Sequence, residues 1–274
     1  MNKEWKNSEI YNSIVDYKSV KNAVENDLGE NYSLISFKFD DFTKKGDNYA
    51  SLVTSIKAKL NHNKNNSESE VTYIVKLNPK REAELWNSIE NDFFIHEGEF
   101  FKTICPELNK ILSSISETPL NMPQSFFRCY TPMREHLINE DMRQKNFIML
   151  DRKKGMDLNH TLVMLRELAK LHAASFILEK NKGILFEEQF PMFKRDLTQN
   201  TKAFTMFCAV MDGQIKNTID ILKELNIYEG AIQVLEVMKN NSKKIYLQQC
   251  LSLSSPKFRC LTHGDCWVNN FLFR

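Results

Sequence analysis

The spacing of hydrophobic and polar positions changes several times along the chain. Between residues 32 and 77 the spacing is close to two, in the segments YSLISFKFD (32–40), YASLVTSIKAKL (49–60) and VTYIVKL (71–77). Such alternation, interrupted by short polar turns, is typical of antiparallel strands joined by hairpins. The tract NHNKNNSESE (61–70) contains no apolar residue, and we interpret it as a solvated hairpin loop. This region therefore predicts three strands.

Helical spacing precedes and follows this region. Residues 1–30 carry apolar side chains at helical intervals and predict a helical lead-in. After Pro79 the spacing is helical again as far as Cys105, where we expect Pro106 to end the helix. Two more apolar segments, QSFFRCYT (124–131) and NFIML (146–150), predict the fourth and fifth strands of the sheet.

The spacing is helical in everything that follows the polar connection DRKKGMD (151–157). We expect helices over 161–180, 194–211, 215–225 and 231–251. A small antiparallel lobe followed by a larger helical lobe is the order of a two-lobed, protein-kinase-like α+β fold. We therefore predict an N-terminal lobe at 1–151 and a helical C-terminal lobe at 152–274.

Composition excludes several other classes of protein. The chain has 274 residues, and its 37 Lys and Arg nearly balance its 35 Asp and Glu, so a nucleic-acid partner is not expected. No apolar run approaches the roughly 20 residues that cross a bilayer, and the charged N-terminus is not a secretory signal. The six scattered cysteines form no CxxC pair. We expect a cytoplasmic monomer without a membrane partner.

The strongest chemical motif is HGDCWVNN at 263–270. Enzymes of the kinase fold use an Asp that accepts the proton of the acceptor hydroxyl and an Asn five residues later that holds magnesium. Asp265 and Asn270 have this spacing, which makes them the candidate catalytic pair, with Asn270 as the candidate metal ligand. The alternative interpretation is a His-Gly-Asp turn that caps a helix.

A second candidate pair lies upstream of this motif. Lys76 stands within the apolar run VTYIVKL, and a buried ammonium group needs a partner. Glu97 falls on the following helix, where a kinase fold places the partner of the lysine that binds the α and β phosphates of ATP. Two alternatives remain open: Lys76 could solvate an edge strand, and Glu99 could be the true partner.

The connection between the first two strands holds the candidate phosphate loop. A kinase fold places a loop over the nucleotide phosphates at this point, and its backbone amides could donate to them. The same Gly-Asp-Asn sequence is also an ordinary hairpin turn. The candidate residues are Gly46, Asp47, Asn48, Tyr49, Ala50 and Ser51.

Several segments in this order resemble one known family. They are TKKGDNYAS, YIVKLNP, FIHEGEFFKTICPEL, MPQSFFRCY, LRELAKLHAASF and THGDCWVNNFLF. Together they resemble the insect ecdysteroid-kinase-like family, also called CHK kinase-like or juvenile-hormone-inducible, which is similar to choline and aminoglycoside kinases. The resemblance spans roughly residues 30–274.

This resemblance implies a kinase that transfers the γ-phosphoryl group of ATP, with Mg²⁺, to a hydroxyl of an ecdysteroid or similar small apolar alcohol. It implies that Lys76 and Glu97 bind the phosphates and that residues 147–151, including Met149 and Asp151, form the hinge that binds adenine. It also implies that Asp265 is the catalytic base, that His263 holds the catalytic loop and that Trp267 packs beneath it. The alternative functions are a non-catalytic ligand-binding pseudokinase and a choline- or aminoglycoside-type kinase.

The sequence departs from the family pattern at two places. Leu150 stands where the family usually has a Glu before the linker. In addition, no second metal-binding Asp in a DFG-like or DFQ-like segment follows the catalytic loop before Arg274. We therefore expect an incomplete helical lobe, exposed apolar surface and impaired catalysis in residues 1–274, as in a C-terminally truncated kinase.

Overall fold

The computed structural model describes residues 3–43, 51–81, 84–193, 201–239, 241–245 and 258–274. Its contacts divide the chain into two compact units. The first unit combines Met1–Met192 with Cys260–Arg274, and the second unit is Phe193–Arg259. The boundary near residue 151 that the sequence indicates between two lobes remains a prediction.

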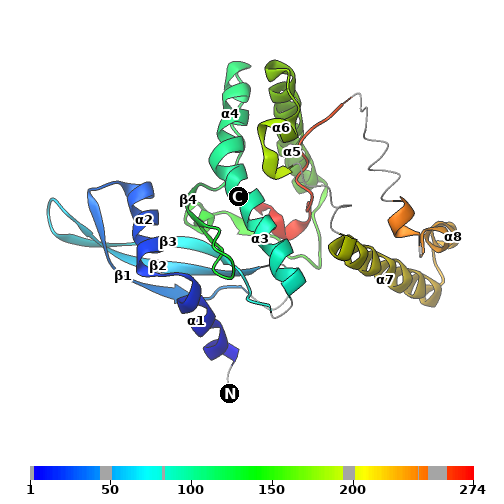
Figure 1. Ribbon diagram of the computed structural model, residues 1–274, viewed down its shortest axis with the longest axis horizontal. Coiled ribbons are helices and arrows are strands. Elements are labelled where there is room, and N and C mark those ends of the chain that lie inside the picture. The colour runs from blue at the N-terminus through cyan, green and yellow to red at the C-terminus, as the bar shows by residue number, and fades with distance from the viewer. Residues whose placement is uncertain (1–2, 44–50, 82–83, 194–200, 240, 246–257) are drawn as a thin grey trace. The chain divides into compact units, whose positions relative to one another are not determined.

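The first unit contains a five-stranded antiparallel sheet in the order β1-β2-β3-β5-β4 (Figure 1). Strands and helices together give the predicted α+β, kinase-like fold. All neighbouring strands run antiparallel. The strand bounds are Tyr32–Asp40 for β1, Leu52–His62 for β2, Ser67–Leu77 for β3, Ser125–Cys129 for β4 and His136–Glu140 for β5.

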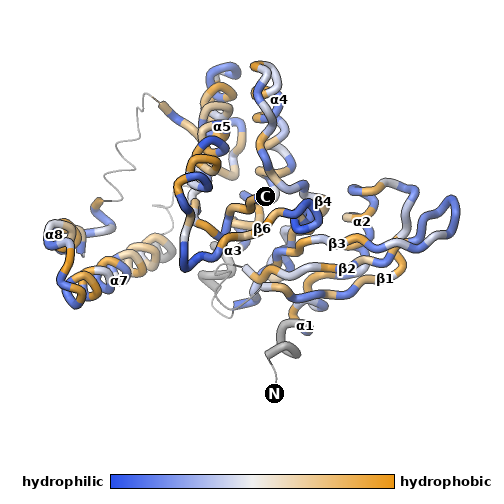
Figure 2. The backbone as a smooth tube through the Cα atoms, turned by 180° about the vertical axis from the view of Figure 1, so that it is seen from behind, coloured by the Kyte–Doolittle hydropathy of each residue, from blue (hydrophilic) through white to orange (hydrophobic). Residues whose placement is uncertain are grey.

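The hairpin between β2 and β3 is longer than the sequence predicts. The strands stay paired to His62 and Ser67, so the turn takes only four residues of the polar tract. Asn66 adopts a φ of 51° at the turn, and Lys59 pairs with Glu68 at 2.6 Å farther back along the strands. Figure 2 shows this end of the hairpin as continuously hydrophilic. Backbone hydrogen bonds hold the two strands together at this end, although the segment has no apolar side chain to bury.

The fifth strand of the sheet is not the one that the sequence predicts. Strand β5 lies between β3 and β4, and its Leu137 and Ile138 are fully buried. Its sequence HLINE has only two apolar residues, so it gives no clear strand pattern. The expected strand at 146–150 is instead the short β6 (Ile148–Met149), which pairs with β7 (Leu272–Phe273) in a separate two-stranded sheet.

One face of the sheet packs against the N-terminal helices. The predicted helical lead-in forms two helices, α1 (Lys3–Ile14) and α2 (Tyr17–Leu28), because the Asp16 side chain accepts a hydrogen bond from Ser19 N and caps the second helix. Helix α2 lies across the strands (Figure 1), and its Val20 and Val24 join Val75 in the core. Since side chains alternate along a strand, Lys76 points to the opposite face.

The helix expected after Pro79 does not stop at Pro106. Helix α3 (Glu84–Glu99) continues through a π-helical turn, Phe100–Ile104, into α4 (Cys105–Ser114). Within this turn Cys105 N donates to Phe100 O, five residues back. Pro106 then lies in the first turn of α4, where a backbone donor has no partner within the helix, so the proline is tolerated there.

Helices dominate the remainder of both units. The first unit contains α5 (Leu158–Lys182) and the short α6 (Phe186–Gln189), and the second contains α7 (Thr201–Leu225) and α8 (Glu229–Met238). The runs expected at 194–211 and 215–225 thus belong, where described, to one helix. The helix expected over 231–251 is interrupted after Met238, residues 242–245 are helical again, and residues 246–251 lie outside the described part. Short 3₁₀ turns occur at Met142–Lys145, Pro191–Phe193 and Val268–Asn270.

No described helix combines the length and the apolar character needed to cross a bilayer. Helix α5 nevertheless exposes several large apolar side chains, Leu158, Leu162, Val163 and Leu165. That the C-terminal lobe is incomplete remains a prediction.

Candidate active site

Lys76 and Glu97 form an ion pair between β3 and α3. The Lys76 ammonium donates to Glu97 Oε2, and its Nζ lies 5.9 Å from the centre of the Phe94 ring. About 30% of each side chain remains exposed, 28% for Lys76 and 31% for Glu97, so a ligand can reach the pair. Strand β3 has neighbours on both sides, so Lys76 does not stand on an edge strand.

Glu99 has different partners from Glu97. Its Oε1 accepts a hydrogen bond of 3.1 Å from the Tyr130 hydroxyl, and its Oε2 accepts one of 3.0 Å from Thr103 Oγ1. Burial and then the negative charge of Glu99 raise the pKa of Tyr130, so this tyrosine stays protonated and keeps its hydroxyl as a donor. The structure thus pairs Lys76 with Glu97, and Glu99 with the side chain that follows β4.

Asp265 and Asn270 lie in direct contact in the HGDCWVNN loop. Asn270 Nδ2 donates to Asp265 Oδ2 and to Asp265 O, each at 2.8 Å. Backbone bonds from Trp267 N to Asp265 O and from Asn270 N to Trp267 O fold the five-residue interval into a compact loop. The hydrogen bond from Asn270 restrains the Asp265 carboxylate, while the residue remains exposed to solvent.

His263 and Gly264 shape the approach to Asp265. Gly264 has a φ of 79°, a conformation that glycine adopts at little cost, and Asp265 N donates to His263 Nδ1 at 3.3 Å. Only a three-residue 3₁₀ turn follows the loop, so the His-Gly-Asp turn does not cap an α-helix. The partly buried Trp267 lies at the start of that turn.

Cys266 is exposed beside Asp265 in the same loop. Partial burial of the thiol and then the Asp265 charge raise its pKa, which keeps the sulfur protonated.

The predicted hinge pairs with the end of the catalytic segment. Ile148 and Met149 of β6 lie opposite Phe273 and Leu272 of β7, and the two β6 residues are exposed. Asp151 follows β6, and its Oδ1 accepts a 2.9 Å hydrogen bond from Lys153 N. This pairing places the hinge beside the residues that directly follow Asn270.

Sequence reasoning missed the residue that attaches the segment before the HGDCWVNN motif to α5. Ser175, 1% exposed on α5, accepts a 2.9 Å hydrogen bond at Oγ from Leu261 N and donates to His172 O. The only signal was a small polar residue in the apolar run LAKLHAASF.

The comparison with protein families gives a match over residues 45–274, to the model described as the ecdysteroid kinase-like family. The chain belongs to the ecdysteroid kinase-like family. This finding confirms the resemblance that the motifs indicate and assigns the chain, in general terms, to kinase-like phosphotransferases. Comparisons with curated proteins and with solved structures gave no match.

An ecdysteroid kinase-like protein is expected to use a divalent metal ion, and the Asp265–Asn270 loop offers suitable donors. The amide nitrogen of Asn270 donates both hydrogen bonds of this side chain, so the amide oxygen is the atom available to coordinate an ion. Carboxylate and amide oxygens are ligands that suit Mg²⁺. Among the described residues, no three His, Cys, Asp or Glu side chains gather into a metal cluster.

Most of the candidate phosphate loop cannot be compared with its prediction, because residues 44–50 lie outside the described part of the chain. Ser51 is described and is 9% exposed at the start of β2.

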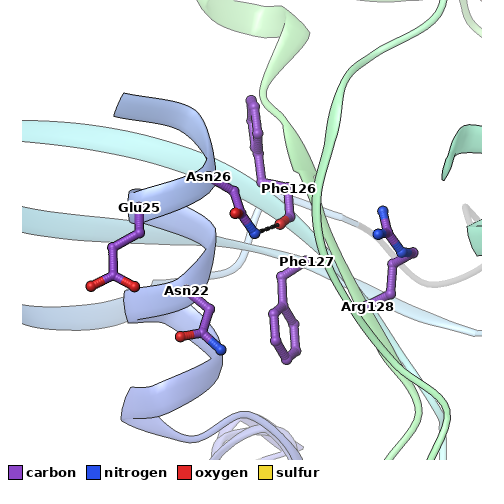
Figure 3. A pocket seen from close by; sticks show the side chains of 6 residues that line it. All are labelled: Asn22, Glu25, Asn26, Phe126, Phe127 and Arg128. Atoms are coloured by element: carbon purple, nitrogen blue, oxygen red, sulfur yellow. Dashed lines mark hydrogen bonds between the residues drawn. The ribbon is translucent and has the colours of Figure 1, made fainter. Parts of the chain in front are cut away.

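A pocket of about 340 Å³ lies away from these motifs, between α2 and the edge strand β4 (Figure 3). Asn26 crosses it with a 2.8 Å hydrogen bond from Nδ2 to Phe126 O. None of the predicted site residues lines it. The lining residues are Asn22, Glu25, Asn26, Phe126, Phe127 and Arg128.

Proposed function

We propose that the protein is an ATP-dependent small-molecule kinase. It transfers the γ-phosphoryl group of ATP to a hydroxyl of an ecdysteroid or a similar small apolar alcohol. The observation that carries the proposal is the ion pair between Lys76 on β3 and Glu97 on α3. A kinase places its phosphate-binding lysine and glutamate on these two elements.

In this proposal Lys76 donates to the α and β phosphates, and Glu97 keeps its ammonium group in place. The partial exposure of both side chains leaves the ammonium accessible to the nucleotide. Gly46, Asp47, Asn48, Tyr49, Ala50 and Ser51 cover the phosphates with backbone donors. Adenine binds along the hinge at 147–151, with Met149 and Asp151 among the contacts.

Asp265 is the catalytic base of the proposed transfer. Its carboxylate accepts the proton of the acceptor hydroxyl as that oxygen attacks the γ-phosphorus. The bond from the γ-phosphorus to the bridging oxygen breaks, and ADP leaves with the bond electrons. The hydrogen bond from Asn270 Nδ2 orients the carboxylate for this step.

Asn270 is the proposed magnesium ligand. A Mg²⁺ ion bound there would neutralise negative charge on the phosphates. The second metal-binding Asp of the family pattern has no counterpart between Asn270 and Arg274.

The first prediction concerns Asp265→Asn. Asparagine keeps the size and the polar character of the side chain but cannot accept the proton, so we expect phosphoryl transfer to fall by about 10²- to 10⁴-fold. The dissociation constant for Mg-ATP, measured by calorimetry, should change less than threefold, a margin of about 0.7 kcal/mol. Asp220→Asn, on the exposed surface of α7, is the matched control.

The assay uses the native protein with panels of steroid alcohols and amino-alcohols. Phosphorylation of the amino-alcohols alone would favour a choline- or aminoglycoside-type kinase. ATP binding without transfer to any alcohol would favour a non-catalytic binding protein. Undiminished transfer by Asp265→Asn would contradict the role assigned to Asp265.

A further inference from the structure

We propose that Tyr130 is a positioning residue for the ATP phosphates. Its ring, seated on Gly98, fixes α3 in the orientation that presents Glu97 to Lys76. This inference rests on the proposed function of the Lys76–Glu97 pair, and it adds to that site a residue to which the sequence motifs assign no role.

The contact at Gly98 is unusually close. A Cβ atom built on Gly98 would overlap the Tyr130 hydroxyl oxygen and would lie 2.9 Å from two carbons of the Tyr130 ring. Real Cβ atoms essentially never come within 3.0 Å of another heavy atom, so only glycine allows the ring to lie so near the helix. Glycine is among the least favourable residues inside a helix, and this close approach gives a physical reason for it here.

The Tyr130 side chain contacts the two residues that follow Glu97 along α3. The ring lies against Gly98, directly after Glu97, and the hydroxyl donates to Glu99 Oε1 at 3.1 Å. These contacts restrain both rotation of α3 about its axis and displacement along it. A helix turns by about 100° per residue, so a small rotation is enough to swing a carboxylate away from its partner.

A buried polar network restrains the same helix about two turns earlier. Glu135 is 1% exposed, and its Oε2 accepts a 2.9 Å hydrogen bond from Asn78 Nδ2. The Asn91 side-chain amide has suitable hydrogen-bond partners for both its oxygen and its nitrogen in only one of its two orientations. In that orientation the nitrogen donates to Glu135 Oε1 at 2.9 Å and to Tyr130 O at 3.3 Å. The backbone of Tyr130 is thus tied to α3 as well, and the network reaches Asn78, two residues after Lys76.

Together these contacts join the end of β3, the residue after β4 and the helix that carries Glu97. The Lys76–Glu97 pair is partly exposed, and an exposed ion pair by itself restrains its elements only weakly. The orientation of Glu97 therefore depends on the tighter contacts that surround it, and Tyr130 provides two of them.

The test measures Mg-ATP affinity by calorimetry and thermal stability for Gly98→Ala and Tyr130→Ala. Each change should weaken Mg-ATP binding by about tenfold or more, because the orientation of a charged contact to the phosphates is lost. Gly213→Ala, a glycine within α7 whose added Cβ would meet nothing within 4 Å, should leave the affinity unchanged. Tyr130→Phe keeps the ring on Gly98 and should retain most of the affinity.

The double variant separates positioning from a general loss of stability. Once Tyr130→Ala has removed the ring, adding Gly98→Ala should cause no further loss of affinity, so the two effects are not additive. A merely structural role would lower the melting temperature of both variants and leave the dissociation constant unchanged, which would overturn the inference. If Gly98→Ala does not fold, Tyr130→Ala and Tyr130→Phe still decide the question. Failure of the unmodified protein to bind Mg-ATP would overturn the proposed function and the inference with it.

Discussion

At the scale of single residues, Lys76 matters for the position of its charge and not for the strength of its ion pair. Its ion pair with Glu97 is partly exposed, and such pairs contribute only about 0–1 kcal/mol to the free energy of unfolding. Its position on an interior strand, facing away from the core shared with α2, makes it available to an anion.

The second prediction is that Lys76→Met weakens Mg-ATP binding by about 10- to 100-fold, the effect of losing one hydrogen bond from a charged donor. Methionine retains the length and apolar character of the lysine stem, so we expect only a small change in melting temperature. Calorimetric titration with Mg-ATP measures the first quantity, and a thermal melt measures the second.

Lys57→Met on the neighbouring strand is the matched control. Lys57 also pairs with a carboxylate, that of Asp40 at 2.6 Å, but it does not belong to the proposed site. Equal losses of affinity in the two variants would show that Lys76 has no particular role.

Asp141 is a buried carboxylate that stabilises the fold in a pH-dependent way. Burial of its side chain opposes ionisation, but hydrogen bonds from Arg143 and Thr72 and the Arg143 charge together outweigh burial and hold the pKa of Asp141 below its usual value. The Arg143 guanidinium contributes two of these bonds, at 2.8 and 2.7 Å, its backbone N contributes a third at 3.1 Å, and Thr72 contributes one at 2.7 Å.

The third prediction follows from this lowered pKa. The unfolded chain takes up a proton at Asp141 more readily than the folded protein, so the stabilisation is present above about pH 3.9 and is lost as the pH falls below it. Asp141→Asn should lower the free energy of unfolding at pH 7 by about 1–3 kcal/mol and flatten its decline in acid. Urea unfolding between pH 7 and pH 3 measures both effects.

The control for this prediction is Asp40→Asn, which removes the carboxylate of an exposed ion pair. Exposed pairs are screened by solvent and contribute little to the free energy of unfolding, so most of the acid sensitivity should remain in this variant. An Asp141→Asn variant as sensitive to acid as the unmodified protein would exclude Asp141 as the cause.

At the scale of elements, α5 anchors the segment that carries the HGDCWVNN motif. Its Asp157 side chain accepts a hydrogen bond from His160 N and caps the first turn. Seventeen residues from the start of the helix, Ser175 binds the backbone at Leu261, directly before Thr262 and the HGD sequence. The helix thus positions the loop through one buried hydroxyl.

The fourth prediction is that Ser175→Ala lowers the free energy of unfolding by about 1–3 kcal/mol, because Leu261 N loses its acceptor. We expect phosphoryl transfer to fall as well, since the approach to Asp265 is no longer fixed. Ser114→Ala is the matched control, because the Ser114 hydroxyl binds only Ile111 O within its own exposed helix turn. Similar effects of the two changes would argue against an anchoring role for Ser175.

Helix α3 shows why some elements could be predicted from sequence and others could not. The helical spacing after Pro79 was correctly recognised, but its stop at Pro106 was wrong. A π-helical turn inserts an extra residue, and the chain enters α4 with the proline where no backbone donor is needed. Strand β5 was missed for a different reason. Its burial comes from neighbours on both sides, whereas its own sequence is largely polar.

At the scale of the whole molecule, the β6–β7 pairing joins parts of the chain that are far apart in sequence. It brings the predicted hinge, which follows the five-stranded sheet, next to the residues that follow the HGDCWVNN loop. Closing such a long loop costs conformational entropy, so the pairing depends on the packing around it.

The fifth prediction tests this pairing by crosslinking. Met149 and Leu272 lie directly opposite each other, so Met149→Cys combined with Leu272→Cys should form a disulfide under mild oxidation. Because it closes a long loop, the crosslink should raise the free energy of unfolding by about 2–4 kcal/mol. Peptide mapping by mass spectrometry identifies the bond, and denaturation measures the gain.

Ile148→Cys with Leu272→Cys is the control, because neighbouring positions on a strand point to opposite faces. Preferential oxidation of this control pair would contradict the register of β6 and β7.

The sequence by itself determined the local elements and singled out the candidate site residues. Apolar spacing indicated β1 to β3 and the main helices, because each pattern reflects one buried face. The HGDCWVNN motif singled out Asp265 and Asn270, because their five-residue interval is set within one short loop. Tertiary structure alone decided which distant segments meet. Packing between elements decides that Lys76 pairs with Glu97 and not with Glu99. It also decides that β5 lies within the sheet and that the Tyr130 ring lies against Gly98. The local spacing of apolar residues carries no information on such contacts.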